Sequence, residues 1–233
     1  MKLPMPRGTL VVSCQARPDN PLHGAGFMAA MAMAAVAGGA AAIRANGAAD
    51  IAAIHRAVPV PIIGLRKRHT PGFAVEITPA IKDATEVVAA GADMVAVDAT
   101  HRPRDGEGVA EVIAAIRTTL VRPVLADIAT VAEAQAAVMA GADAVATTLS
   151  GYTEATLTSR DAAPDLALVA QLAATLPVPV IAEGRFWSPD EVARAFDAGA
   201  WAVVIGTAIT NPREITRRFV AALPITARSE GAC

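Results

Sequence analysis

Short apolar segments follow an Ala-Gly-Ala motif at three places in the chain, and this repeat is the feature that most limits its possible folds. The motif glycines are Gly91, Gly141 and Gly199, and Gly39 marks a looser fourth copy, so the intervals are 52, 50 and 58 residues. A glycine at a helix C-terminus adopts the left-handed conformation at little cost. Each copy is therefore typical of a helix that ends at glycine and leads into a buried strand.

A second kind of apolar segment, introduced by proline, lies between these copies. Pro61, Pro123 and Pro179 each precede a run of aliphatic residues. Proline suits the first position of a strand because no ladder donor is lost there. With the apolar run at residues 10–15, the sequence contains eight candidate strands, and the two kinds alternate.

Ala-rich amphipathic patterns, such as residues 79–90 and 130–140, separate the candidate strands. Strands that alternate with helices indicate an α/β protein with a parallel sheet. Eight such units in a chain of this length predict that residues 1–233 form one (β/α)8 TIM barrel domain. The alternative is an open doubly wound sheet, although no Gly-x-Gly-x-x-Gly motif follows the first strand.

Composition excludes several classes of protein. The chain is 54% hydrophobic and 18% charged, with a formal charge of -2, which excludes a disordered protein and argues against a nucleic-acid partner. Residues 25–43 carry no charge and are long enough to suggest a membrane span. Because the run is Ala-rich and contains Gly38-Gly39, we expect a helix, a glycine stop and a strand, with no membrane partner. Cys14 and Cys233 are too few for a disulfide framework, and no secretory signal is evident, so we expect a cytoplasmic protein.

Polar side chains concentrate where the candidate strands end, whereas the strand interiors are aliphatic. In a (β/α)8 barrel, the active site lies at the C-terminal ends of the strands. The candidate side chains, in chain order, are Gln15, Arg44, Asn46, Lys67, Asp98, Thr100, Asp127, Thr147, Thr148, Ser150, Glu183, Arg185 and Thr207. Any one of them could be a turn cap, but the whole set indicates a site.

Lys67 is the most informative of these residues. The chain has 20 Lys and Arg residues, of which three are lysines. In a composition so biased toward arginine, a lysine at a strand end suggests a group that must lose and regain its proton, which arginine cannot do. Burial and nearby cations, for which Arg44 and Arg185 are candidates, would lower the pKa of Lys67 and make it a general base. We expect Glu183 to be its partner across the barrel. A structural lysine–carboxylate pair is the alternative.

The side chains beside Lys67 are expected to point the other way. Arg66 and Arg68 flank the lysine in sequence, and successive side chains on a strand alternate between its two faces. We therefore expect both arginines to point away from the side that Lys67 occupies.

The loops after the seventh and eighth strands predict a phosphate site. Gly184 and Arg185 follow the seventh strand, and Gly206 and Thr207 follow the eighth and open a helix. Backbone N–H groups at a helix start bind anions, and barrel enzymes often bind phosphate here. Ordinary tight turns are the alternative.

We expect neither a metal nor another cofactor. A metal-dependent sugar-phosphate epimerase would place paired His and Asp ligands at strand ends. The histidines His23, His55, His69 and His101 do not form that pattern, and no P-loop, nucleophile elbow or Cys-x-x-Cys motif is present.

These residues make the sequence resemble the N-acetylmannosamine-6-phosphate 2-epimerase family. The resemblance spans nearly the whole chain, and it is carried by Val-Ser-Cys-Gln at 12–15, Lys-Arg at 67–68, Ile-Thr-Pro at 77–79, Val-Asp at 97–98, Ala-Asp at 126–127, Thr-Thr-Leu-Ser-Gly-Tyr-Thr at 147–153, Ile-Ala-Glu-Gly-Arg at 181–185 and Ala-Ile-Thr at 208–210. The family inverts C2 of an N-acetylhexosamine 6-phosphate without a metal, and acts in sialic acid and amino-sugar catabolism.

The resemblance also implies roles for single residues. Lys67 matches the catalytic lysine and Glu183 its glutamate partner, while Gln15, Arg44 and Asp127 match substrate-binding positions. Thr148 and Ser150, within the specific 147–153 run, are expected to bind substrate too. We further expect a homodimer.

The chain departs from the family pattern at four places. Asn46 replaces a usual glutamate, which puts a polar contact near Arg44 in doubt. Asn211 replaces a usual arginine, so that Arg185 and backbone donors would have to bind the phosphate. Ala146 and the loop 69–73 also differ from the usual residues.

The expected reaction needs a base, which Lys67 could provide. The C2 proton is acidic enough to be removed only when the sugar is an open-chain aldehyde. A base then removes it, an enolate forms, and a proton returns to the other face. Two alternatives stay open: another metal-free phosphosugar isomerase on the same barrel, and a non-catalytic sugar-phosphate sensor.

Overall fold

The computed structural model describes residues 1–159 and 161–224. Cys233 and the last residues of the expected 1–233 domain therefore lie outside the described residues. The strands are β1 (Thr9–Cys14), β2 (Ala42–Asn46), β3 (Ile62–Leu65), β4 (Met94–Asp98), β5 (Val124–Asp127), β6 (Ala144–Ala146), β7 (Val180–Glu183) and β8 (Ala202–Ile205). The α-helices are α1 (Ala25–Ala37), α2 (Ala48–Ala57), α3 (Ile81–Ala89), α4 (Val109–Thr118), α5 (Val131–Met139), α6 (Leu166–Thr175), α7 (Pro189–Asp197), α8 (Thr207–Thr210) and α9 (Pro212–Ala221), and two 3-10 turns, η1 (Thr147–Leu149) and η2 (Glu154–Thr156), follow β6.

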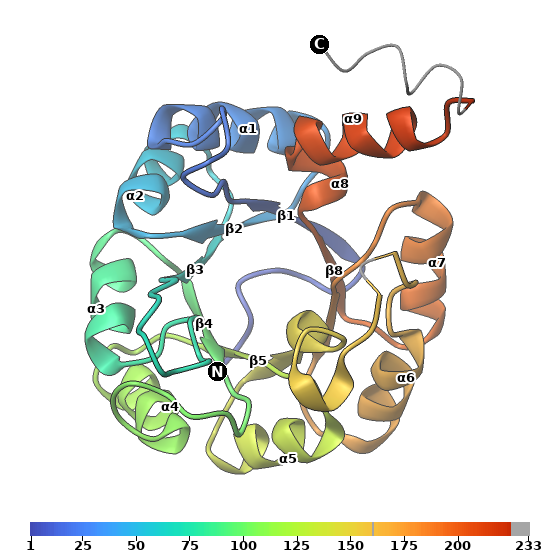
Figure 1. The fold of residues 1–233 in the computed structure, drawn as a ribbon. Coiled ribbons are helices and arrows are strands. Elements are labelled where there is room, and N and C mark those ends of the chain that lie inside the picture. The colour runs from blue at the N-terminus through green and yellow to red at the C-terminus, as the bar shows by residue number, and fades with distance from the viewer. Residues whose placement is uncertain (160, 225–233) are drawn as a thin grey trace.

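The strands form a closed parallel barrel with the helices around it (Figure 1). β1 pairs in parallel with both β2 and β8, so the sheet has no free edge. The predicted (β/α)8 barrel is confirmed, and the open doubly wound sheet is wrong.

The four marker glycines have the conformation that the repeat predicted. Gly39, Gly91, Gly141 and Gly199 all have φ between 98° and 108°, a region that residues with a Cβ atom rarely adopt. Each follows a helix and precedes a strand, namely β2, β4, β6 and β8. The glycines therefore end the helices sharply enough for the next strand to enter the barrel.

Two apolar layers hold the barrel together. One lies between the sheet and the helices, and the other fills the barrel interior. The N-terminal segment contributes Leu3 and Met5 to the interior layer, and the indole N–H of Trp201 donates to the Met5 carbonyl at 3.4 Å. The segment thus covers the end of the barrel where the strands begin.

The uncharged run at 25–43 forms helix α1, the glycine pair and the start of β2, as expected. Gly38 is the C-cap of α1. No helix within residues 1–159 and 161–224 is long and apolar enough to cross a membrane.

Alternation along the strands positions the polar residues. Ile63 and Leu65 of β3 belong to the interior layer, and the next residue on that side is Lys67. On three other strands, the residue two positions after an interior residue is likewise a polar candidate: Arg44 follows Ala42, Asp127 follows Leu125 and Glu183 follows Ile181. The candidate side chains therefore continue the inward-facing rows at the open end of the barrel.

Candidate active site

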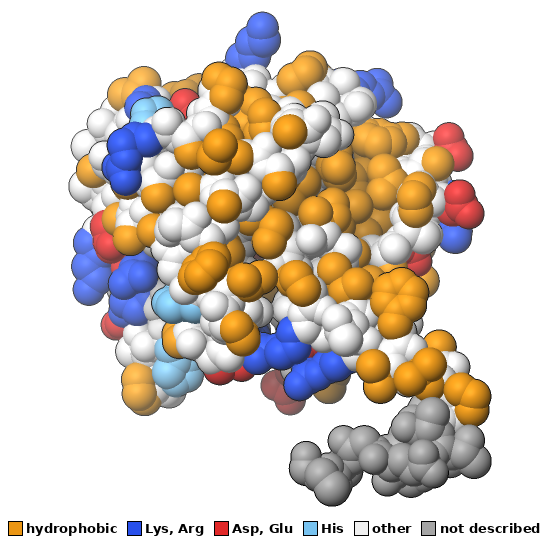
Figure 2. Space-filling model, turned by 90° about the horizontal axis from the view of Figure 1, so that it is seen from above, with side chains coloured by type: hydrophobic (Ala, Val, Ile, Leu, Met, Phe, Trp, Pro, Cys, Tyr) orange, Lys and Arg blue, Asp and Glu red, His pale blue; other side chains and the backbone are white. Residues whose placement is uncertain are grey.

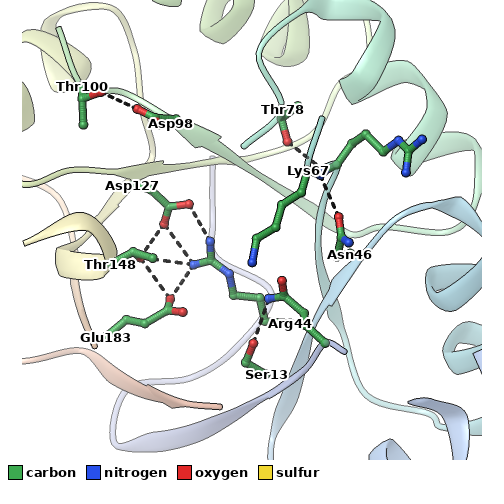
Figure 3. A network of polar contacts seen from close by, with 12 residues as sticks. Ser13, Arg44, Asn46, Lys67, Thr78, Asp98, Thr100, Asp127, Thr148 and Glu183 are labelled. Carbon is green, nitrogen blue, oxygen red and sulfur yellow. Dashed lines mark hydrogen bonds and ion pairs between the residues drawn. The ribbon is translucent and has the colours of Figure 1, made fainter. Parts of the chain in front are cut away.

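Arg44 lies at the centre of a buried ionic cluster at this end of the barrel (Figure 3). Its guanidinium binds the Asp127 carboxylate with two hydrogen bonds, of 3.0 and 2.5 Å, and donates to Glu183 Oε2 at 2.5 Å. Arg44 is 1% exposed and Asp127 is fully buried. Burial alone would lower the pKa of Arg44, but the charges of Asp127 and Glu183 raise it above its ordinary value. Arg44 is therefore a permanent cation that holds two carboxylates in place.

Two threonines complete the cluster. The Thr148 hydroxyl lies 2.6 Å from Asp127 Oδ1 and 3.1 Å from Glu183 Oε2. The Thr147 hydroxyl contacts the peptide of Glu183 at both its N–H and its carbonyl, each at 3.0 Å. The end of β6 thus fixes the main chain and the carboxylate of Glu183.

Lys67 extends from the end of β3 toward the Arg44 guanidinium (Figure 3). Its side chain stays accessible to solvent, as a base that must meet a substrate requires. The protein around its ammonium excludes much of the water, and this desolvation is the main cause that lowers the pKa of Lys67. The charge of Arg44 lowers it further, Glu183 and Asp127 oppose the change, and Arg17 adds to it. The lysine is therefore biased toward its neutral, basic form.

The direct Lys67–Glu183 pair that we expected is not formed. Among the described residues, Glu183 makes its ion pair with Arg44 instead, and it acts on Lys67 only as a nearby charge. A guanidinium presents several donors in a planar fork and can bind two carboxylates at once, which an ammonium group does less well. Arg44 and Arg17 are among the largest causes that lower the pKa of Lys67, and Arg185 is not.

Glu183 has a perturbed pKa of its own. Desolvation is the largest cause that raises it, the Asp127 charge adds to the rise, and Arg44 opposes it. Its side chain is 14% exposed, whereas those of Arg44 and Asp127 are 1% and 0% exposed. Glu183 is thus the member of the carboxylate pair that a substrate can reach, and its environment raises its pKa above the ordinary value.

The arginines on either side of Lys67 point outward, as alternation predicted. Arg66 pairs with Glu86 at 3.6 Å. Arg68 donates to Asp83 at 3.2 Å and to Asp105 at 2.5 Å. Neither guanidinium is part of the ionic cluster around Arg44.

Gln15 offers a free acceptor near this cluster. Its Nε2 donates to the Ser13 hydroxyl at 2.8 Å. Its Oε1 and the Nε of Arg44 are buried and have no hydrogen-bond partner in the described part of the chain. Unsatisfied buried polar atoms are costly in a protein interior, and a ligand can satisfy them.

Ser150 and Arg185 lie in the loops beside the cluster and already have protein partners. The Ser150 hydroxyl donates to Asp165 at 2.6 Å. The Arg185 guanidinium donates to the carbonyls of Ala163 and Ser150, at 3.1 and 2.5 Å, and lies 5.5 Å from the centre of the Tyr152 ring. Arg185 therefore holds the loop after β6 in place, whatever else it binds. Ligand binding by either residue stays a prediction.

Gly184 and Gly206 occupy turns at the ends of β7 and β8. Gly184 has φ 108°. Gly206 is the N-cap of α8, which begins at Thr207, and a Cβ on Gly206 would lie 3.3 Å from that of Ser13. Both turns bring the main chain close to the barrel mouth, and the phosphate site itself stays a prediction.

Asn46 and Thr78 also contribute to this region; Asn46 was among the candidate side chains but was given no role, and Thr78 was not among them. The Asn46 side chain accepts a hydrogen bond from the Lys67 N–H at 2.7 Å. Thr78 is fully buried, has φ 46°, and accepts from the Arg66 N–H at 3.1 Å. Asn46 is the second inward position after Ala42 on β2, as its place among the strand-end candidates indicates, but nothing in the sequence indicates the unusual backbone of Thr78.

No group of three or more His, Cys, Asp and Glu side chains within the described ranges is arranged to hold a metal ion. Catalysis without a metal stays a prediction, and the ionic cluster around Arg44 is compatible with it.

Comparison with known proteins agrees with this geometry. The profile of a family described as "Putative N-acetylmannosamine-6-phosphate epimerase" matches residues 28–224. Relatives that carry the corresponding 2-epimerase name include one from Thermosynechococcus vestitus, 49% identical over 93% of this chain and 94% of its own. Another, from Caldanaerobacter subterraneus, is 48% identical over 91% of this chain and 89% of its own.

Solved structures agree as well. The N-acetylmannosamine-6-phosphate 2-epimerase from Clostridium perfringens superposes with a TM-score of 0.90 at 43% identity, over 94% of this chain and 95% of that one. A thiamine phosphate pyrophosphorylase from Pyrococcus furiosus, with a TM-score of 0.60 and 14% identity, is similar in fold alone. Because the profile and the relatives cover nearly the whole barrel, the chain belongs to the N-acetylmannosamine-6-phosphate epimerase family.

Proposed function

We propose that this protein interconverts N-acetylmannosamine 6-phosphate and N-acetylglucosamine 6-phosphate by moving the proton at C2. The observation that carries the proposal is geometric: Lys67 extends toward the buried Arg44 cluster at the barrel mouth, which includes the partly accessible Glu183 (Figure 3). The direction of the pKa shifts agrees with it, because the pKa of Lys67 is lowered and that of Glu183 is raised. A lysine whose pKa is lowered and a carboxyl group whose pKa is raised suit a reaction that removes and returns one proton.

Lys67 is the base in this proposal. In the open-chain sugar, the neutral amine takes the C2 proton, and the electron pair of the C–H bond moves into an enolate whose oxygen was the C1 aldehyde. The resulting Lys67 ammonium lies near the carboxylates that Arg44 holds, which oppose the lowering of its pKa. Protonation at the opposite face of C2 by Lys67 or Glu183 then gives the epimer, and no metal or cofactor is required.

The remaining predicted residues bind the substrate in this scheme. Gln15 Oε1 and Arg44 Nε, both buried without partners in the described chain, are available to the sugar. Gly184, Arg185, Gly206 and Thr207 would bind the 6-phosphate through backbone N–H groups and the remaining donors of the guanidinium. Thr148 and Ser150 would line the sugar site between them.

The experiment that tests the function is turnover in heavy water, followed at C2 by proton NMR. We expect deuterium at C2 of both sugars at a rate that matches epimerisation. Epimerisation without deuterium uptake would contradict proton transfer with solvent-exchangeable groups. An aldose–ketose product from another phosphosugar would favour a different metal-free isomerase, and binding without exchange or product would favour a sensor.

We also propose that the enzyme is a homodimer that associates through the surface around α1 and α9. Helix α9 has ten residues and buries none of its side chains, although isolated helices of this length are marginal in water. Phe219 on α9 is 75% exposed, and Phe27 and Met33 on α1 are 53% and 54% exposed. Figure 2 views this side of the molecule and shows apolar side chains spread widely across it. A second copy would bury such a surface.

Light scattering on size-exclusion fractions tests the dimer. We expect a dimer for the unaltered chain, and a monomer with an intact barrel for Phe219→Glu. A monomer at every concentration of the unaltered chain would contradict the proposal. The proposed function supports a place in cytoplasmic sialic acid and amino-sugar catabolism.

A further inference from the structure

Asn46 connects the end of β2 to the main chain of Lys67. Its Oδ1 accepts a hydrogen bond from the Lys67 N–H at 2.7 Å (Figure 3). Lys67 lies two residues beyond the end of β3 at Leu65, so the regular strand no longer determines its position. A group that binds its peptide there also determines where its side chain begins.

The start of α2 explains why the Lys67 N–H bonds to the Asn46 side chain and not to a main-chain carbonyl. The last ladder bond between the two strands runs from the Gly47 N–H to the Leu65 carbonyl, at 2.8 Å. In a parallel ladder, the Lys67 N–H would next be expected to use the Gly47 carbonyl. That carbonyl already accepts from the Ile51 N–H at 3.0 Å, as the first bond of α2. Because α2 uses the Gly47 carbonyl, the Asn46 side-chain oxygen accepts the hydrogen bond from the Lys67 N–H in its place.

The other side of Lys67 is held by main-chain bonds. Lys67 forms an antiparallel bridge with Ile77. The Thr78 N–H donates to the Arg66 carbonyl at 2.7 Å, and the Arg68 N–H donates to the Glu76 carbonyl at 2.9 Å. Lys67 is thus tied to the 76–78 segment on one side and to β2 through Asn46 on the other.

Strand β2 also carries Arg44, two residues before Asn46 and on the same face of the strand. One short strand therefore holds both the guanidinium at the centre of the ionic cluster and the amide that fixes the lysine peptide.

We propose that Asn46 is a positioning residue for the epimerase: its amide oxygen fixes the Lys67 peptide to β2 and so aims the ammonium beside Arg44. Asn46 acts through Lys67 and need not touch the substrate. The proposal rests on the proposed function in that it takes Lys67 to be the base. The charged groups that act most strongly on Lys67 are Arg44, Glu183, Arg17 and Asp127.

Three variants test the proposal. Asn46→Ala removes the acceptor, and Asn46→Asp keeps an acceptor but adds a negative charge. Asp93→Ala is the matched control, because Asp93 Oδ2 accepts from the Ile62 N–H at 2.9 Å, at the start of the same strand β3 and far from the mouth. Each variant is assayed for kcat, KM, melting temperature and the titration of Lys67 by NMR, which is tractable with three lysines in the chain.

We expect Asn46→Ala to lower kcat about tenfold, the scale of one lost hydrogen bond, with little change in KM. The Lys67 titration should move to higher pH, because the ammonium is less closely held beside the Arg44 cation. Asn46→Asp should recover kcat at high pH, with the rising limb of the pH profile displaced upward by the added charge. Asp93→Ala should lower the melting temperature as Asn46→Ala does, yet leave kcat and the Lys67 titration unchanged.

A kcat for Asn46→Ala within about twofold of the unaltered enzyme, with an unchanged Lys67 titration, would overturn the proposal. Equal losses of kcat in Asn46→Ala and Asp93→Ala would overturn it as well, because they would indicate a general loss of stability. If Asn46→Ala does not fold, a tenfold loss at every pH in Asn46→Asp contradicts it. A shifted lysine titration in a protein that does not epimerise would instead refute the proposed function and leave the positioning role standing.

Discussion

Replacing Asp127 by Asn tests whether the Arg44 cluster is an ionic structure that the fold depends on. The Asn side chain keeps the shape and can still accept one hydrogen bond, but it loses the charge that faces Arg44. Arg44 and Asp127 are 1% and 0% exposed and make two hydrogen bonds, of 3.0 and 2.5 Å. Leaving one member of a buried pair without its partner costs about 3–5 kcal/mol.

The lower end of that range applies here, because Glu183 still binds Arg44 at 2.5 Å. For a domain of this size, 1 kcal/mol lowers the melting temperature by about 2–4 °C. We therefore expect Asp127→Asn to melt roughly 6–12 °C below the unaltered protein when both are followed by circular dichroism.

The matched control is Glu86→Gln, which removes the charge from an exposed ion pair. Arg66 and Glu86 are 41% and 45% exposed and lie 3.6 Å apart. Such pairs contribute at most about 1 kcal/mol. The reasoning is refuted if Asp127→Asn lowers the melting temperature no more than Glu86→Gln does.

Three further predictions concern the reaction. Arg185→Ala should raise KM for the phosphorylated sugar roughly tenfold or more, because a charged hydrogen bond contributes about 1.5–3 kcal/mol; equal losses on unphosphorylated N-acetylmannosamine would mean that Arg185 acts on the chemistry or on the loop after β6. Glu183→Gln removes a charge that raises the pKa of Lys67, so the Lys67 titration seen by NMR should move to lower pH; a move to higher pH would contradict the site electrostatics. Activity should survive exhaustive chelation, and loss on chelation with recovery on adding one divalent ion would contradict metal-free catalysis.

Much of the barrel could be predicted from the sequence because its signals are local. A glycine with positive φ, such as Gly91 or Gly141, ends a helix by its own conformational freedom. Alternation along a strand then determines which residues point inward, and this placed Lys67, Arg44, and Glu183 on the inward-facing rows at the barrel mouth.

Pairing across the barrel could not be predicted in the same way. Alternation indicates which face a side chain occupies, but not which partner it meets among several that converge at the mouth. Glu183 pairs with Arg44 rather than Lys67, because the guanidinium fork can bind two carboxylates at once. The Arg185 guanidinium turns toward the loop after β6, and a rotamer of that kind has no local sequence signal. The role of Asn46 arises because the first hydrogen bond of α2 uses the Gly47 carbonyl. It depends on how a strand and a helix meet, which the sequence of either one alone does not show.

The central claim is that Lys67 moves the C2 proton, and Lys67→Arg tests it most directly. Arginine keeps the positive charge and much of the length, but it cannot give up its proton at accessible pH. We expect turnover to fall by about 10²–10⁴, while binding of N-acetylmannosamine 6-phosphate, measured by calorimetry, stays largely intact. A Lys67→Arg variant that retains more than about a tenth of the original kcat would contradict the account, because another group would then be the base.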